Sequence, residues 1–127
     1  MIGLVLVSHS PMLAGGVLEL LSQLAPDVPV RVAAGTDDGR IGTSPDAVAV
    51  ALERVDADEV VVLADLGSAV LSVRVALEDL DLDPARFVLV DAPFVEGAVS
   101  AAVTAGTGAD LAAVVEAAEE ARTIPKF

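Results

Sequence analysis

The sequence predicts an α/β domain, because four short apolar runs alternate with segments of helical periodicity. The apolar runs are nearly continuous, which is typical of parallel strands that helices cover on both faces of a sheet. The expected strands are residues 2–7, 28–33, 59–64 and 87–90. Parallel strands of this kind are joined by right-handed crossovers.

Five helices are expected between and after these strands. The second has the clearest start, because Ser44 can cap it, Pro45 suits its first turn and Asp46 suits the positive end of its dipole. Asp110 favours the start of the last helix. The first helix carries an apolar stripe made of Leu13, Val17, Leu20, Leu21 and Leu24. The expected helices cover residues 11–24, 45–55, 67–80, 93–105 and 108–122.

The chain has 127 residues, of which 54% are apolar, and this suffices for the core of one domain. We expect that domain over residues 1–122 and a tail, or the start of a linker, over residues 123–127. No apolar run reaches the roughly 18 to 20 uncharged residues of a membrane helix, and no basic segment precedes the first strand. A cytoplasmic protein is expected, and the lack of cysteine excludes disulfides and thiolate catalysis.

The formal net charge of −13 restricts the expected partners. It repels the phosphate backbone of nucleic acids and anionic membrane surfaces, and it attracts basic proteins. Acidity that only keeps the domain soluble explains the same charge and is the more common case. The three aromatic residues, all Phe, offer little surface on which bases or sugars can stack.

The chemistry is expected in the loops that follow the strands, because open α/β sheets bind ligands beyond the carboxyl ends of their strands. His9, the one histidine, follows the first strand directly. A lone histidine is structural by default, but this position favours a catalytic role. A histidine that accepts a phosphoryl group must be neutral, and a carboxylate on its other nitrogen fixes the tautomer. Asp65 ends the third strand and can reach His9 if the first and third strands are neighbours; a cap on the following helix is the alternative for Asp65.

Glycines and hydroxyls in the same loops suit an anion. Gly67 and Ser68 open one helix, and Gly35, Gly42 and Thr43 precede another. Helix N-termini favour phosphate, although ordinary turn chemistry accounts for most such glycines. None of these stretches is a P-loop or a dinucleotide fingerprint, so the sequence gives no support for direct ATP binding.

Two other site classes fit the sequence poorly. One histidine without cysteine cannot form a closed zinc site, and no calcium-loop spacing is present, so no metal site is expected. A serine hydrolase is also disfavoured, because the G-x-S-x-G elbow is missing and the serines beside His9 are too close to it in sequence.

Five segments together resemble a known family: Gly3 to Ser10, Ala33 to Asp38, Ile41 to Thr43, Val62 to Ala69 and Ala92 to Gly97. In their order and spacing the chain resembles the mannose-type IIA domain of the phosphotransferase system. It more closely resembles the phosphotransferase subunit of phosphoenolpyruvate-dependent dihydroxyacetone kinase, and residues 65–69, Asp-Leu-Gly-Ser-Ala, favour that branch.

This resemblance implies a doubly wound sheet of strand order 2-1-3-4 with helices on both faces, and a homodimer. It implies that His9 carries the phosphoryl group and that Asp65 orients it. The expected phosphate-binding residues are Ser10, Gly35, Thr43, Gly67 and Ser68.

The resemblance also implies the partners of a phosphotransferase. The phosphocarrier HPr would donate to His9, and ADP on the nucleotide-binding kinase subunit would accept. No cofactor is expected on this chain, since nucleotide and Mg²⁺ belong to the partner subunit. Met12, Leu66 and Phe94 are candidate partner contacts, with packing as the favoured alternative for each.

Three other functions stay open at this stage. A sugar-transport IIA component and a regulatory phosphohistidine module would use the same His9. A small tetrapyrrole metal chelatase also places a histidine after its first strand, but it normally needs a second histidine, and this chain has one.

Overall fold

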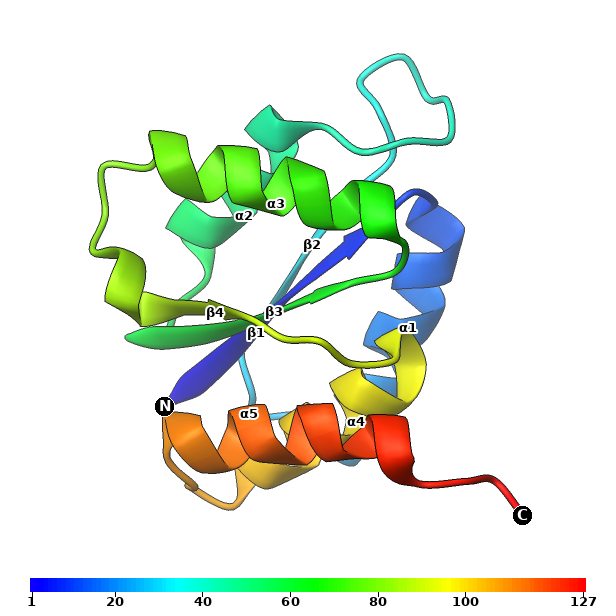
Figure 1. Ribbon diagram of the computed structural model, residues 1–127, viewed down its shortest axis with the longest axis vertical. Helices are drawn as coiled ribbons and strands as arrows, with labels where there is room; N and C mark the ends of the chain where they lie inside the picture. Colours follow the sequence, from blue (N-terminus) through cyan, green and yellow to red (C-terminus); the bar gives the residue numbers. More distant parts are fainter.

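Four parallel strands form a sheet in the middle of the molecule (Figure 1). The computed structural model describes all residues from 1 to 127. The strands are β1 Ile2–Ser8, β2 Val30–Ala34, β3 Glu59–Ala64 and β4 Phe87–Leu89. They lie in the order β2-β1-β3-β4, and every neighbouring pair is parallel. The expected doubly wound sheet of order 2-1-3-4 is therefore confirmed.

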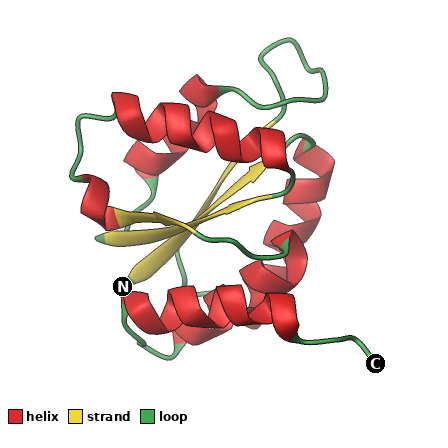
Figure 2. Ribbon diagram, viewed as in Figure 1, coloured by secondary structure: helices red, strands yellow, loops and turns green.

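Helices cover both faces of this sheet (Figures 1 and 2). The helices α2 and α3 pack on one face, and α1, α4 and α5 pack on the other. Short 3₁₀ turns precede β4 and follow α5. The helices are α1 Pro11–Leu24, α2 Pro45–Arg54, α3 Gly67–Asp79, α4 Phe94–Gly106 and α5 Leu111–Glu120.

The central strand β1 divides the core in two, because successive side chains of a strand point to opposite faces. Leu4 and Leu6 enter the cluster beneath α1, α4 and α5, whereas Val5 and Val7 enter the cluster beneath α2 and α3. All seven residues of β1 are buried, which fixes the register of the strand and the position where it ends.

Two elements begin two or more residues away from their expected first residue, and most other boundaries differ by at most a single residue. The strand β2 begins at Val30 rather than at residue 28, because Pro29 has no N–H to donate to the ladder. The carbonyl of Pro29 still accepts from the N–H of Leu4 at 2.9 Å. The helix α5 begins three residues later than expected, because Asp110 caps it through the N–H of Ala113.

The expected apolar stripe of α1 is only partly buried. Val17 and Leu21 face the core together with Ala14. The three other leucines, Leu13, Leu20 and Leu24, are 44%, 45% and 53% exposed. The sheet and α4 cover only one side of α1, so the buried face of the helix is narrower than the expected apolar stripe.

Beyond α5, a 3₁₀ turn over Ala121–Thr123 leads into an exposed end of the chain. The expected division between a domain at 1–122 and a tail at 123–127 stays a prediction. No helix in the structure combines the length and the apolar character needed to span a bilayer.

Candidate functional site

His9 and Asp65 meet at the carboxyl edge of the sheet, because β1 and β3 are neighbours. The register pairs Val7 with Ala64, so the residues that follow each strand emerge side by side. The N–H of Asp65 donates to the carbonyl of Val7 at 3.1 Å and extends the ladder by one bond. Two residues 56 positions apart in the sequence are thereby placed in contact.

The carboxylate of Asp65 accepts four hydrogen bonds. Its Oδ1 lies 2.9 Å from Nδ1 of His9 and 2.8 Å from the N–H of Leu66. Its Oδ2 lies 2.9 Å from the N–H of His9 and 2.9 Å from Oγ of Ser8. Asp65 is therefore held rigidly against the histidine backbone and its ring at once.

This contact determines which ring nitrogen of His9 carries the lone pair. An ionised carboxylate only accepts hydrogen bonds, so Nδ1 of a neutral ring must carry the proton and Nε2 must carry the lone pair. Oγ of Ser68 lies 2.5 Å from Nε2 and donates to it in this tautomer. The side chain of His9 is 15% exposed and that of Asp65 is 6% exposed, so the ring nitrogen is near the surface while its carboxylate partner is shielded.

Hydrogen bonds stabilise the negative charge of Asp65 although the carboxylate is partly buried. Burial alone would raise the pKa of Asp65, but hydrogen bonds from the backbone and ring of His9 and from Ser8 outweigh it and lower the pKa. The carboxylate is thus ionised at neutral pH.

The N-terminus of α3 faces the same nitrogen. Its N-cap is Leu66, which supplies no side-chain cap, so Asp65 does not cap α3 and the alternative considered for it is wrong. The N–H groups of Gly67 and Ser68 have no hydrogen-bond partner in the chain. Unpaired N–H groups at a helix N-terminus, together with the helix dipole, favour an anion.

The other expected phosphate-binding residues are engaged elsewhere. Ser10 caps α1 by accepting from the N–H of Leu13. The hydroxyl of Thr43 lies 2.5 Å from that of Ser72 on α3. Gly35 has a φ of 75°, which favours glycine, and its N–H donates to the carbonyl of Ser8 at 3.1 Å.

These contacts give Ser10, Gly35 and Thr43 structural roles in the loops that follow β1 and β2. The loop between β2 and α2 is tied to the site, because the N–H of Gly42 donates to the carbonyl of His9 at 3.1 Å. A phosphate-binding role for the three residues stays a prediction, and of the five expected residues only Ser68 touches Nε2 of His9.

Ser8 is the site residue that sequence reasoning missed. It is the last residue of β1 and fully buried, and its hydroxyl reaches Asp65. The only feature of the sequence that points to Ser8 is that a small polar residue follows an apolar strand. That feature suggested a loop residue rather than a buried hydrogen-bond donor.

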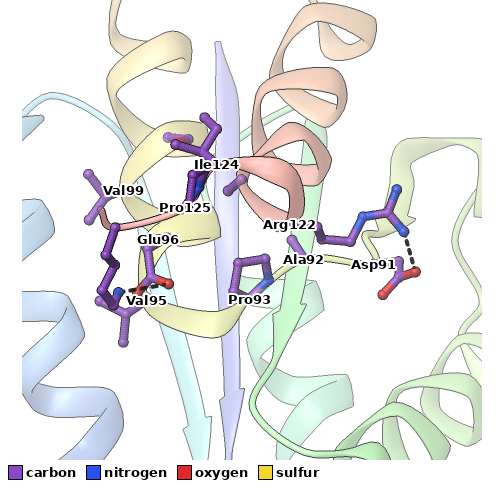
Figure 3. Close-up of a pocket in the computed structure, with 12 residues that line it drawn as sticks. Asp91, Ala92, Pro93, Val95, Glu96, Val99, Arg122, Ile124 and Pro125 are labelled. Carbon is purple, nitrogen blue, oxygen red and sulfur yellow. Dashed lines mark hydrogen bonds and ion pairs between the residues drawn. The ribbon is translucent and has the colours of Figure 1, made fainter.

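A separate cavity of about 790 Å³ lies between α4 and the end of the chain (Figure 3). Its two cations are already paired, Arg122 with Asp91 at 2.7 Å and Lys126 with Glu96 at 3.4 Å. Neither His9 nor Asp65 lines it. No group of three or more His, Cys, Asp or Glu side chains is arranged to hold a metal ion anywhere in the chain.

The fold and the site together define a class of protein. A doubly wound parallel sheet with a carboxylate-bound histidine at its carboxyl edge is what the resemblance to the mannose-type IIA domain implied. A family model described as the PTS system fructose IIA component matches residues 3–115, and the chain belongs to this family. It is accordingly a component of a phosphotransferase system.

Several relatives have more specific names. The chain is 42% identical over 100 residues to the phosphoryl donor subunit of phosphoenolpyruvate-dependent dihydroxyacetone kinase 1 from Listeria innocua, covering 79% of this chain and 78% of the relative. It is 35% identical to the phosphotransferase subunit of the dihydroxyacetone kinase of Lactococcus lactis, covering 93% and 94% of the two chains. It is 46% identical to the phosphoryl donor subunit from Escherichia coli, of which it spans only 26%.

A solved structure has the same fold. The crystal structure of EF1359, a protein of unknown function, superposes with a TM-score of 0.83 at 37% identity. The match covers 94% of this chain and 93% of EF1359, so the whole architecture is shared.

Proposed function

We propose that this chain is the phosphoryl-carrier subunit of a phosphoenolpyruvate-dependent dihydroxyacetone kinase, with the phosphoryl group carried on His9. The names of the relatives from Listeria innocua and Lactococcus lactis support the kinase, because the chain covers most of their length. The contact between Nδ1 of His9 and Oδ1 of Asp65 at 2.9 Å is the observation that carries the proposed chemistry. It leaves Nε2 as the nucleophile.

The proposed step is an in-line displacement between two histidines. The lone pair of Nε2 forms a bond to phosphorus while the phosphorus–nitrogen bond of the donor histidine breaks, and the electron pair of that bond returns to the donor nitrogen. The Nδ1 proton stays between the ring and Asp65, whose charge balances the positive charge that develops on the ring. No water or added base takes part.

The charge of the transferring group is spread by donors that are already in place. The hydroxyl of Ser68 turns from Nε2 to a phosphoryl oxygen, and the free N–H groups of Gly67 and Ser68 donate to the same group. Such preorganised donors are the main contribution of a protein to phosphoryl transfer.

The proposed donor is HPr, and the proposed acceptor is ADP bound to the nucleotide-binding kinase subunit, where Mg²⁺ is also held. Both meet the chain in the cytoplasm. Met12 and Leu66 support contact with other proteins, since they are 89% and 60% exposed. Phe94 does not, because it packs against the core. A homodimer remains a prediction.

The test is phosphorylation followed by intact mass. The chain is incubated with phosphoenolpyruvate, enzyme I and HPr, and we expect a mass gain of one phosphoryl group that acid removes. His9→Ala should gain none. An unmodified native chain, or a labelled His9→Ala chain, would refute the proposal.

A sugar-transport component is the second candidate, because the matching family is described by the name of a fructose system. Addition of ADP and the nucleotide-binding kinase subunit separates the two. Loss of the phosphoryl group with formation of ATP supports the kinase branch. Retention of the label supports the sugar-transport branch or a regulatory module.

A further inference from the structure

The chain buries one polar residue completely, and that residue touches the site. Ser8 is 0% exposed and is the only polar or charged residue among the buried ones. A buried hydroxyl is costly unless it is hydrogen-bonded, so its partners indicate why a serine rather than an apolar residue ends β1.

The hydrogen bonds around Ser8 indicate that its hydroxyl donates to Asp65. Oγ of Ser8 accepts from the N–H of Ser10 at 3.1 Å. The carbonyl of Ser10 also lies 3.1 Å from Oγ, but it already accepts from the N–H of Ala14. Oδ2 of Asp65 is closer, at 2.9 Å, and it is charged, which makes it the stronger acceptor.

Two side chains donate hydrogen bonds to Asp65, namely the ring of His9 and the hydroxyl of Ser8. The two remaining donors are backbone N–H groups. That of His9 donates to Oδ2, and that of Leu66 donates to Oδ1. Without the Ser8 hydroxyl, Oδ2 keeps a single donor, the N–H of His9, and the carboxylate is held less firmly against rotation about its bond to Cβ. Rotation would misalign Oδ1 from Nδ1 of His9.

We infer that Ser8 is a positioning residue for His9, which acts through Asp65 to hold the Nδ1–H tautomer and keep Nε2 free for phosphorylation. This inference rests on the proposed role of His9. Ser8 itself makes no contact with the histidine ring, so its effect passes through the carboxylate.

The test reads the ring nitrogens of His9 directly. The chain has one histidine, so ¹⁵N-histidine labelling gives the NMR signals of this ring alone. In the unphosphorylated native chain we expect a protonated Nδ1 and a bare Nε2. In Ser8→Ala the two shifts should move toward each other as the tautomers mix. The rate of phosphorylation by phosphoramidate, at saturating concentration, should fall about tenfold, which is what one hydrogen bond to a charged group is worth.

Two variants separate positioning from simple destabilisation. Val7→Ala removes buried packing from the neighbouring residue and should leave the ring shifts native. Ser8→Thr keeps the hydroxyl and should restore the tautomer. If Ser8→Ala does not fold, Ser8→Cys replaces it, because a thiol is a weak donor of similar size, and it should mix the tautomers too.

Native ring shifts in Ser8→Ala, or in Ser8→Cys where that replaces it, would overturn the inference, as would mixed tautomers in Val7→Ala. Failure of the native chain to be phosphorylated would instead refute the proposed function, since the tautomer measurement needs no phosphoryl donor.

Discussion

At the scale of single residues, the proposed chemistry of His9 depends on Asp65. Each of its oxygens accepts two hydrogen bonds, so a side chain with one oxygen cannot replace it. In Asp65→Asn the amide nitrogen replaces one oxygen and cannot accept the two hydrogen bonds that this oxygen accepts in the native chain. We expect the rate of His9 phosphorylation to fall by about 10²- to 10⁴-fold, as when the carboxylate of a histidine dyad becomes an amide. A phosphorylation time course measures this.

Asp91→Asn is the matched control, because Asp91 follows the neighbouring strand and its side chain is 82% exposed and paired with Arg122. This variant should be phosphorylated at the native rate. A native rate in Asp65→Asn would show that the carboxylate does not orient the ring.

The lowered pKa of Asp65 predicts how stability depends on pH. The folded pKa lies below the ordinary value of 3.8, so the folded state favours the ionised carboxylate. Its contribution is complete above that value and is lost as the pH falls through the folded pKa. Urea unfolding at a series of pH values below 4 should show a steeper loss of stability for the native chain than for Asp65→Asn. Parallel curves would contradict the shift.

At the scale of elements, the N-terminus of α3 is predicted to bind the phosphoryl group through N–H groups. Gly67→Pro deletes one of them at the first helical position, where proline is well tolerated. The extended φ of −131° and ψ of 164° at Leu66 suit a residue before proline. We expect native stability and a roughly tenfold slower phosphorylation.

Gly67→Ala is the comparison for this variant. A Cβ at Gly67 meets no atom within 4 Å, and alanine keeps the N–H. Calorimetry and the phosphorylation rate should both stay near the native values. Equal rates for the proline and alanine variants would show that this N–H does not contact the phosphoryl group.

The sequence predicted elements whose causes are local. Ser44 and Pro45 predicted the start of α2, and both act as expected, since Ser44 accepts from the N–H of Ala47. The position of Asp65 beside His9 required β1 and β3 to be neighbours, which no local pattern contains. The resemblance to a family supplied that strand order. The Ser8 contact depends on a 2.9 Å distance between side chains and was beyond both sources.

At the scale of the whole molecule, the side chain of His9 is only 15% exposed, whereas two apolar side chains close to it in sequence or next to Asp65, Met12 and Leu66, are strongly exposed. Met12 lies in the first turn of α1 and Leu66 directly precedes α3, so both lie at the carboxyl edge of the sheet where His9 is placed. We expect Met12→Ser and Leu66→Ser to lower kcat/KM with phospho-HPr about tenfold each, as loss of a buried interface contact does. The rate with phosphoramidate should be unchanged.

Leu71→Ser is the control for these two variants. Leu71 is 62% exposed on α3 and lies outside the first turn that faces His9. It should behave as the native chain with either donor. Equal losses with phospho-HPr and phosphoramidate in Met12→Ser and Leu66→Ser would mean that the variants damage the site rather than a docking surface.

The position of phosphorus on the ring of His9 shows whether Nε2 is the nucleophile. The chain is labelled with ¹⁵N-histidine, phosphorylated and examined by NMR for coupling between phosphorus and each ring nitrogen. We expect coupling to Nε2 and a proton on Nδ1. Coupling to Nδ1, or a phosphoryl group on any other residue, would contradict the proposed role of Nε2.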